Sequence, residues 1–251
     1  MRKAGCGVLL AVFVLAAVTT AWADQYTDQG WNFKKDKDGI KIYNREKLDS
    51  DIRELLAITE IDAPSWRLFA VVGKYDDFKE FMPYTVVSKC LKRERISEKK
   101  TINYFFTALD LPLVSNRYYT LRLTDEMDAD GRPGVARSAW TMSREQGLDP
   151  SYDDPQVSGL FPDNFSDPVK TSINDGYWLF EPVGDGSSTR VSYYVYTDPG
   201  GKIPSFVANQ ANSIAVPKLM DAVRKRVKDP RYDRFAPKER GSDESPPDAV
   251  Q

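Results

Sequence analysis

Histidine is absent from this 251-residue sequence, and cysteine occurs only twice, at Cys6 and Cys90. Without histidine there are no Ser-His or Cys-His nucleophile pairs, no histidine general bases and no histidine metal ligands. Carboxylates, lysines, tyrosines and one thiol would have to carry any catalysis, and no histidine activates that thiol. We therefore expect no catalytic residues, no metal ion and no cofactor.

An excess of positive charge is also missing. The formal net charge is −2, and it falls to about −4 if the first 23 residues are removed, because Arg2 and Lys3 leave with them. A mildly acidic protein has little electrostatic attraction to nucleic acid or to an anionic membrane. We expect no nucleic-acid partner and one domain of generous size.

The sequence has one long apolar run, Gly7 to Val18, which is too short for a typical membrane span. Arg2 and Lys3 precede it, and Ala21-Trp22-Ala23 matches the small-x-small pattern of a cleavage site. Residues 1–23 are therefore predicted to be a signal peptide, and the mature chain to be secreted or periplasmic. An uncleaved N-terminal anchor is the alternative. Cleavage would leave Cys90 as the one cysteine, so no internal disulfide could form.

The remaining chain alternates between strand-like and helix-like patterns. A short helix is expected over 24–39, anchored by Trp31 and Phe33, and another over 63–83. Period-two alternation predicts strands at 40–46, 53–61, 85–96, 100–109, 117–127, 134–143, 173–183 and 189–198. Residues 147–170 are expected to form a long irregular loop, and 204–228 the last helix.

This order of elements favours an α+β fold. An antiparallel sheet needs a cover for one face, and a terminal helix of about 24 residues is about 36 Å long, enough to cross it. We expect a helix-grip fold, in which a curved antiparallel β-sheet wraps around a long C-terminal α-helix. The domain is predicted to span 24–229. Residues 230–251 are polar and proline-containing, and are predicted to be a disordered tail.

Three stretches carry a family resemblance: "LPLVSNRYYTLR" (111–122), "DGYWLFEPV" (175–183) and "TDPGGKIPSFVANQ" (197–210). Together they resemble the StAR-related lipid-transfer (START) domain in its bacterial, secreted form. The resemblance implies one lipid or sterol in a cavity between the sheet and the C-terminal helix. Tyr118 departs from the family, which usually has an acid after Arg117. Tyr104 and Leu123 stand where some sterol-binding members bury an acid and a base, which implies a less charged cavity or a different ligand.

Period-two alternation sorts the strand residues into faces. Singly, each inward apolar residue is best explained as ordinary core. Collectively they favour a pocket, because Tyr104, Tyr119, Trp178 and Tyr193 each carry a donor that needs a partner when buried. The predicted ligand-binding residues are Tyr104, Phe106, Tyr119, Leu121, Leu123, Trp178, Phe180, Tyr193, Val195, Val207, Ala211, Ala215, Leu219 and Val223.

The last helix combines a small-residue stripe with a helix-breaking proline. Ala211 and Ala215 are too small to fill a wide space over the sheet, so a ligand could fill it. Pro217 cannot donate to the carbonyl of Ser213, which favours either a hinge for a lid or a fixed curve. Arg117, Asn209 and Pro217 are assigned to structure or gating.

The sequence therefore predicts a monomeric, exported carrier that binds one sterol, phospholipid or fatty-acyl molecule without altering it. Transient membrane contact could involve the basic stretch 224–228 at the end of the last helix. An aromatase/cyclase-like enzyme on the same fold is one alternative, with Tyr104, Arg122 and Glu181 as its acid-base groups. A lipid-sensing interaction domain is another.

Overall fold

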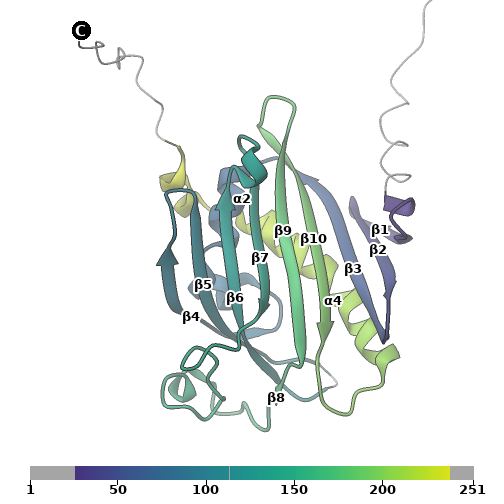
Figure 1. Cartoon of the computed structure of the whole chain (residues 1–251), viewed down its shortest axis with the longest axis vertical. Coiled ribbons are helices and arrows are strands. Elements are labelled where there is room, and N and C mark those ends of the chain that lie inside the picture. Colours follow the sequence, from purple (N-terminus) through teal and green to yellow (C-terminus); the bar gives the residue numbers. More distant parts are fainter. Residues whose placement is uncertain (1–25, 113, 238–251) are drawn as a thin grey trace, which may run out of the picture.

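The computed structural model describes residues 26–112 and 114–237 (Figure 1). The predicted signal peptide and residues 238–251 of the predicted tail lie outside the described residues. Within them, no helix is both long enough and apolar enough to cross a membrane.

The described residues form one ten-stranded sheet. Its order is β1-β2-β3-β10-β9-β7-β6-β5-β4, with antiparallel neighbours, and β8 pairs in parallel with β6. The pairing of β3 with β10 joins the N-terminal strands to the later ones. The strands are β1 (Asn32–Lys37), β2 (Ile40–Lys47), β3 (Ser50–Ile61), β4 (Thr85–Arg95), β5 (Lys100–Leu109), β6 (Arg117–Met127), β7 (Ala136–Met142), β8 (Val169–Lys170), β9 (Ile173–Val183) and β10 (Ser188–Asp198).

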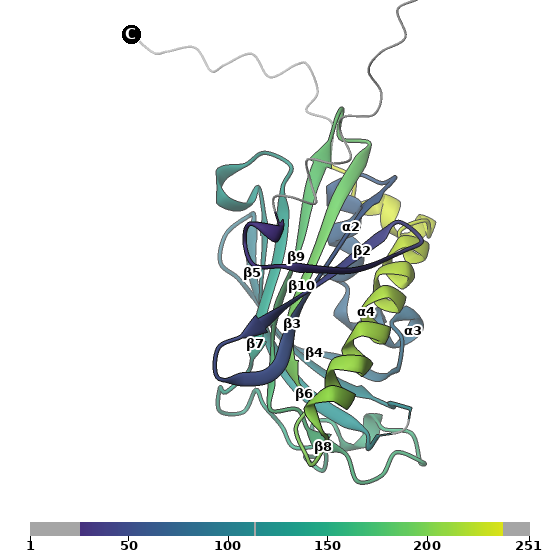
Figure 2. The ribbon, with the colours of Figure 1, turned by 90° about the vertical axis from the view of Figure 1, so that its right-hand side faces the viewer.

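Helices cover one face of this sheet, which we call the inner face (Figure 2). They are α2 (Ser65–Val72), α3 (Phe78–Phe81) and the long α4 (Ser205–Arg226), and a 3-10 turn (Tyr75–Asp77) links α2 to α3. Pro64 is the N-cap of α2 and Gly73 its C-cap, so the single helix expected over 63–83 is divided. The helix-grip α+β fold is therefore confirmed.

The main core lies between the inner face and the helices. Leu68, Val71 and Val72 of α2 pack with Phe180 of β9 and Val223 of α4, all at most 1% exposed. This packing fills the space under the C-terminal half of α4. The first half of α4 has no such filling beneath it.

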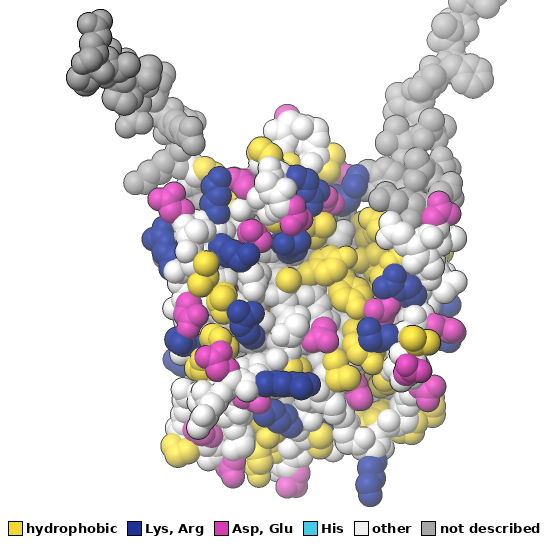
Figure 3. Space-filling model, in the orientation of Figure 1, with side chains coloured by type: hydrophobic (Ala, Val, Ile, Leu, Met, Phe, Trp, Pro, Cys, Tyr) yellow, Lys and Arg dark blue, Asp and Glu magenta, His cyan; other side chains and the backbone are white. Residues whose placement is uncertain are grey.

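A second cluster lies on the opposite, outer face. Phe106 and Ala108 of β5 pack there against Tyr118 of β6 and Val157 of the long 143–168 connection. Elsewhere on this face, basic and acidic side chains are interspersed, and further hydrophobic side chains gather at the upper right of the view (Figure 3). The loop predicted at 147–170 thus covers apolar residues that the sheet turns away from α4.

One predicted helix is a strand instead. Residues 32–37 form β1, which pairs with β2, because the pairing satisfies backbone groups that an isolated short helix would leave open. Trp31 is buried against Tyr43, as an anchor would be. Phe33 is 53% exposed, so it anchors no core.

The folded region extends beyond the predicted boundary at 229. Residues Pro230–Phe235 form a 3-10 helix capped by the Asp229 carboxylate. Tyr232 is fully buried, and its hydroxyl accepts a hydrogen bond from Arg226 Nε at 3.1 Å. The prediction of a disordered tail rested on its polar composition, which did not take Tyr232 into account. This buried side chain holds the segment beside α2.

We predict that adding one methyl group at Gly176 destabilises the sheet. A Cβ there would lie 2.4 Å from the Tyr194 carbonyl oxygen and 2.5 Å from Cζ2 of Trp140, so backbone must move. Gly176→Ala should lower the free energy of unfolding in urea by about 1–3 kcal/mol. Gly159→Ala is the control, since a Cβ at Gly159 would meet no described atom within 4 Å. Equal stability of the two variants would contradict this close approach.

A candidate binding cavity beneath the last helix

A cavity of about 420 Å³ lies between the inner face of the sheet and the first half of α4. Strands β5, β6, β7, β9 and β10 form its floor, and α4 its roof. The remaining lining residues come from the segment 82–85, from the loop 199–204, and from Val72, Tyr75, Phe78, Leu111, Pro112, Val114 and Thr171. The cavity therefore occupies the space that Ala211 and Ala215 leave unfilled.

The wall is mostly apolar and aromatic. Trp178 and Tyr193 pack at 4.5 Å between ring centroids, and Tyr193 also lies against Trp140 at 5.7 Å. Such a wall offers an apolar molecule contact without demanding hydrogen bonds. The apolar lining includes Val72, Phe78, Met82, Phe105, Leu109, Leu121, Leu123, Trp140, Trp178, Val195, Ile203, Val207, Ala208, Ala211, Ala215, Val216 and Leu219.

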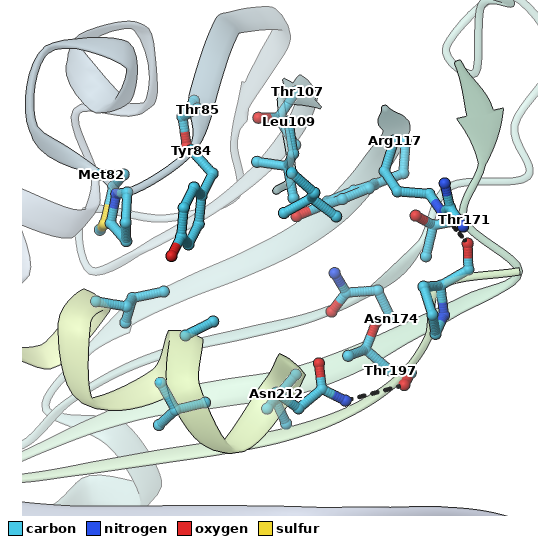
Figure 4. Close-up of a pocket in the computed structure, with 18 of the residues that line it drawn as sticks. Met82, Tyr84, Thr85, Thr107, Leu109, Arg117, Thr171, Asn174, Thr197 and Asn212 are labelled. Carbon is cyan, nitrogen blue, oxygen red and sulfur yellow. Dashed lines mark hydrogen bonds between the residues drawn. The ribbon is translucent and has the colours of Figure 1, made fainter. Parts of the chain in front are cut away.

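Polar groups gather at one end of the cavity, where Arg117 lies close to Thr171, Asn174 and Thr197 (Figure 4). Arg117 is 2% exposed. Its Nε donates to the Pro199 carbonyl at 2.7 Å, and its Nη2 to the Gly200 carbonyl at 3.2 Å. Burial lowers the pKa of this guanidinium.

The turn before α4 is shaped for this contact. Gly200 and Gly201 both have positive φ, and a Cβ at Gly200 would lie 2.7 Å from the Ser172 hydroxyl oxygen. Arg117 Nη1 also donates to the carbonyls of Ser115 and Asn116, at 2.5 and 3.2 Å. One side chain thereby joins the loop before β6 to the turn that starts α4.

Two tyrosines and an amide lie on the floor near this end. The Asn174 Oδ1 accepts a hydrogen bond from Trp140 Nε1 at 2.9 Å, which orients the amide toward the cavity (Figure 4). Burial raises the pKa of Tyr119 to about 12, although hydrogen bonding to Asn174 opposes the shift. Burial, with Tyr119 nearby, also raises the pKa of Tyr193. Both hydroxyls therefore stay protonated and able to donate.

A buried acid stands behind the opposite end. The Tyr75 hydroxyl donates one bifurcated hydrogen bond to the two oxygens of Asp125, at 2.8 and 2.7 Å, and Asn103 Nδ2 donates to Asp125 Oδ2 at 2.8 Å. Burial raises the pKa of Asp125, while hydrogen bonds from Ser138 and Tyr75 oppose the shift. Tyr75 and Ser138 line the cavity, but Asp125 does not. Its oxygens are already occupied, so the group fixes the wall.

The helix that forms the roof is tethered to the sheet. Asn209 Oδ1 accepts from the Arg53 N–H at 2.9 Å, and its Nδ2 donates to the Asp51 carbonyl at 3.0 Å. The Ser213 carbonyl, which Pro217 cannot satisfy, accepts from Lys35 Nζ of β1 at 3.3 Å. Lys35 thus supplies the hydrogen bond that Pro217 cannot make, and the same bond holds α4 against the sheet.

Most of the predicted site residues come together in this cavity. Arg117 also lines it, whereas Asn209 and Pro217 do not. The predicted ligand-binding residues that line it are Tyr119, Leu121, Leu123, Trp178, Tyr193, Val195, Val207, Ala211, Ala215 and Leu219.

Two corrections concern β5. Tyr104 and Phe106 were placed on the inner face, but they point outward, because Tyr104 pairs with Arg122 and Phe106 with Thr120 across the β5–β6 ladder. Phe105, opposite Leu121, takes the inner position instead. The run Tyr104-Phe105-Phe106 is apolar on both faces, so alternation alone could not choose between them.

Two further corrections concern the far end. Phe180 and Val223 do point inward, but they are fully buried in the core rather than in the cavity wall. The reason is α2, whose Leu68 and Val71 occupy the space beneath that part of α4. These residues point toward the helix-covered side of the sheet, as predicted, but the cavity is shorter than the predicted set of ligand-binding residues.

The sequence reasoning missed the polar end of the cavity apart from Arg117. Asn174 is the second residue of β9, Thr171 follows β8, and Thr197 lies near the end of β10. These positions are adjacent only because β8 pairs with β6 and β9 with β10. Asn174 offered one signal, since it is an amide at an inward position of a strand with Trp178 four residues on.

Comparison with known proteins shows the fold. No known family model matches the chain. An uncharacterized protein of Pseudomonas aeruginosa is 27% identical over 202 residues, covering 80% of this chain and 88% of that one. A STAR-related lipid transfer protein from Xanthomonas axonopodis matches with a TM-score of 0.60 and 24% identity, over 80% of this chain and 99% of that one. Human STARD10 matches with a TM-score of 0.64 and 15% identity, over 88% and 84%. The described chain is folded as a START-like domain, as its sequence predicted.

We predict that removing the Asn209 tether frees the start of α4. Asn209→Ala deletes two hydrogen bonds to the 51–53 backbone, each contributing about 0.5–1.5 kcal/mol. Amide hydrogen exchange over 205–216 should become several-fold faster. Gln210→Ala is the control, because that exposed amide makes no side-chain hydrogen bond within the described residues. Unchanged exchange in Asn209→Ala would show that the tether does not hold the helix.

Proposed function

We propose that this protein binds one hydrophobic molecule in the cavity beneath α4 and carries it without altering it chemically. One observation supports this most strongly: a mostly apolar cavity of about 420 Å³ lies beneath α4, with polar groups at one end. Protein interiors seldom keep such voids unless something occupies them. The volume suits a sterol-sized molecule or one acyl chain.

The energetics of such binding are favourable. A ligand of this size would bury on the order of 400 Å² of apolar surface, which contributes about 10 kcal/mol before the costs of ordering are subtracted. The aromatic floor gives this contact with little side-chain freedom to lose, because its rings already pack against one another. Desolvation of the ligand is therefore the driving force.

The similarity to START structures supports the same proposal. The Xanthomonas axonopodis protein is described as a lipid transfer protein, and it covers most of this chain. In both, the shared architecture places a long helix over one face of a curved sheet. The cavity of this chain lies in that place, so a lipid is the class of ligand we infer.

The proposal also includes the absence of catalysis. The acid-base groups suggested for an enzyme lie outside the cavity: Tyr104 donates to Glu145, and Glu181 pairs with Arg132 at 2.7 Å. The cavity hydroxyls of Tyr119 and Tyr193 have raised pKa values, so they stay protonated near neutral pH and supply no general base. Holding and releasing a ligand is the role that these groups favour.

Export and membrane contact complete the proposal. The basic and apolar pattern of residues 1–23 supports secretion or a periplasmic destination, with the mature chain acting as a monomer. Phe206 and Ile214 on α4 are 70% and 48% exposed, next to cavity-lining Val207 and Ala215. Transient contact of this helix with a membrane would bring the cavity close to an acceptor.

We predict that filling the cavity abolishes binding while the fold survives. Ala211→Trp and Ala215→Trp each place a large ring where a ligand would lie. Binding of a neutral fluorescent probe, N-phenyl-1-naphthylamine, to the delipidated protein should weaken at least tenfold in each variant. Far-ultraviolet circular dichroism should stay unchanged, because the ring enters existing space.

Ala222→Trp provides the matched control for this test. Ala222 lies on the same helix but outside the cavity, so probe affinity there should equal that of the unmodified protein. If the filled variants bind the probe as well as the control does, the ligand site lies elsewhere and the carrier proposal fails.

A further inference from the structure

The cavity carries one formal charge, and it is positive. Of the described residues that line it, Arg117 alone has an ionised side chain. The other polar lining groups are neutral hydroxyls and amides, from Thr85, Thr107, Ser138, Thr171, Asn174, Thr197, Gln210 and Asn212, together with the tyrosines. The electrostatic field inside the site therefore comes mainly from one guanidinium, which favours an anion over a cation.

This charge has no partner of opposite sign in the described chain. None of the ion pairs among described residues includes Arg117. Burial alone lowers its pKa, and no acid offsets that shift. The four hydrogen bonds of the side chain all go to backbone carbonyls, which stabilise a cation without neutralising it. A buried charge left in this state is costly.

The hydrogen-bond inventory points the same way. The four bonds use Nε–H, both hydrogens of Nη1 and one hydrogen of Nη2, so one N–H of Arg117 is left over. The Asn174 amide extends toward the cavity with its oxygen already bonded, so its NH₂ group faces the ligand space. The Tyr119 and Tyr193 hydroxyls remain protonated donors. The polar end offers mainly donors.

Donors grouped beside an uncompensated cation fit an oxyanion. We propose that the ligand is a long-chain carboxylic acid, bound as its carboxylate at the Arg117 end, with its chain lying along the aromatic floor under Ala211 and Ala215. The inference rests on the carrier function proposed above and specifies the ligand class of that same cavity.

Neutral and cationic amphiphiles fit less well. An alcohol head would accept one hydrogen bond but leave Arg117 without a counter-ion. A quaternary ammonium head would bring a second positive charge to the only charged residue of the described lining and would offer no acceptor. The order of affinity that follows is carboxylate, then alcohol, then ammonium, for one fixed chain length.

The test compares different head groups on the same alkyl chain, so it needs no variant of the protein. The delipidated full-length mature protein is loaded with N-phenyl-1-naphthylamine, and the probe is displaced by palmitate, hexadecanol, methyl palmitate or hexadecyltrimethylammonium. Palmitate should displace the probe at a concentration at least tenfold lower than hexadecanol or methyl palmitate, and the ammonium should be weakest. Equal or better displacement by hexadecanol overturns the carboxylate proposal while leaving a neutral-lipid carrier intact. If neither the probe nor any of the four competitor molecules binds, the carrier function is overturned as well.

Two variants then test the charge of Arg117 separately from its hydrogen bonds to the backbone carbonyls. Arg117→Lys and Arg117→Met both remove the bonds to the Pro199 and Gly200 carbonyls, but only the lysine keeps the charge. The preference for palmitate over hexadecanol should persist in the lysine variant and fall to within about threefold in the methionine variant. An undiminished preference in the methionine variant contradicts the role of this charge.

A spectroscopic measurement covers the case in which neither variant folds. The carboxyl resonance of carbon-13-labelled palmitate, bound to the unmodified protein, is followed against pH. A neighbouring cation lowers the pKa of a carboxyl group, so the bound acid should titrate at lower pH than palmitate in neutral detergent micelles. Titration at higher pH would show that the acid binds in its neutral form, which overturns the proposal.

Discussion

The small side chains at one end of α4 and the packed core at its other end are the constraint on which the structure depends. Under the C-terminal half of the helix, Leu68 and Val71 of α2 fill the space over the sheet. Under its first half, Ala211 and Ala215 reach only part of the way, and no second helix lies beneath them. The sheet and the tethers at Asn209 hold the helix at this distance, so the void is built into the fold.

Arg117 connects two segments that line the polar end of the cavity. Arg117 joins the loop before β6 to the turn before α4, and both segments line one end of the cavity. A ligand that changes the bonding of this side chain would change how firmly the two loops are held together. Lys35 and Asn209 bind the roof to β1 and to the start of β3, so the helix is fixed along its flank.

The sequence was sufficient for the architecture because its patterns are local. Alternation and turn residues predicted the strands between 85 and 198 to within about two residues, except β8, whose two residues were assigned to the long loop. The single helix expected over 63–83 is divided into α2 and α3. The sequence was insufficient wherever both faces of a strand are apolar, as at Phe105, or where distant pairing decides. The strand at 32–37 exists because β2 lies beside it. Asn174 reaches the site only through the meeting of β8, β6, β9 and β10.

The central claim is that the void under α4 holds one hydrophobic molecule. Native mass spectrometry of the protein purified without detergent from its own cells measures this most directly. We expect a mass above that of the mature chain by one hydrophobic molecule, which organic extraction removes and releases unchanged. A bare chain mass under these gentle conditions, with no organic-soluble molecule recovered at one per chain, would contradict the account.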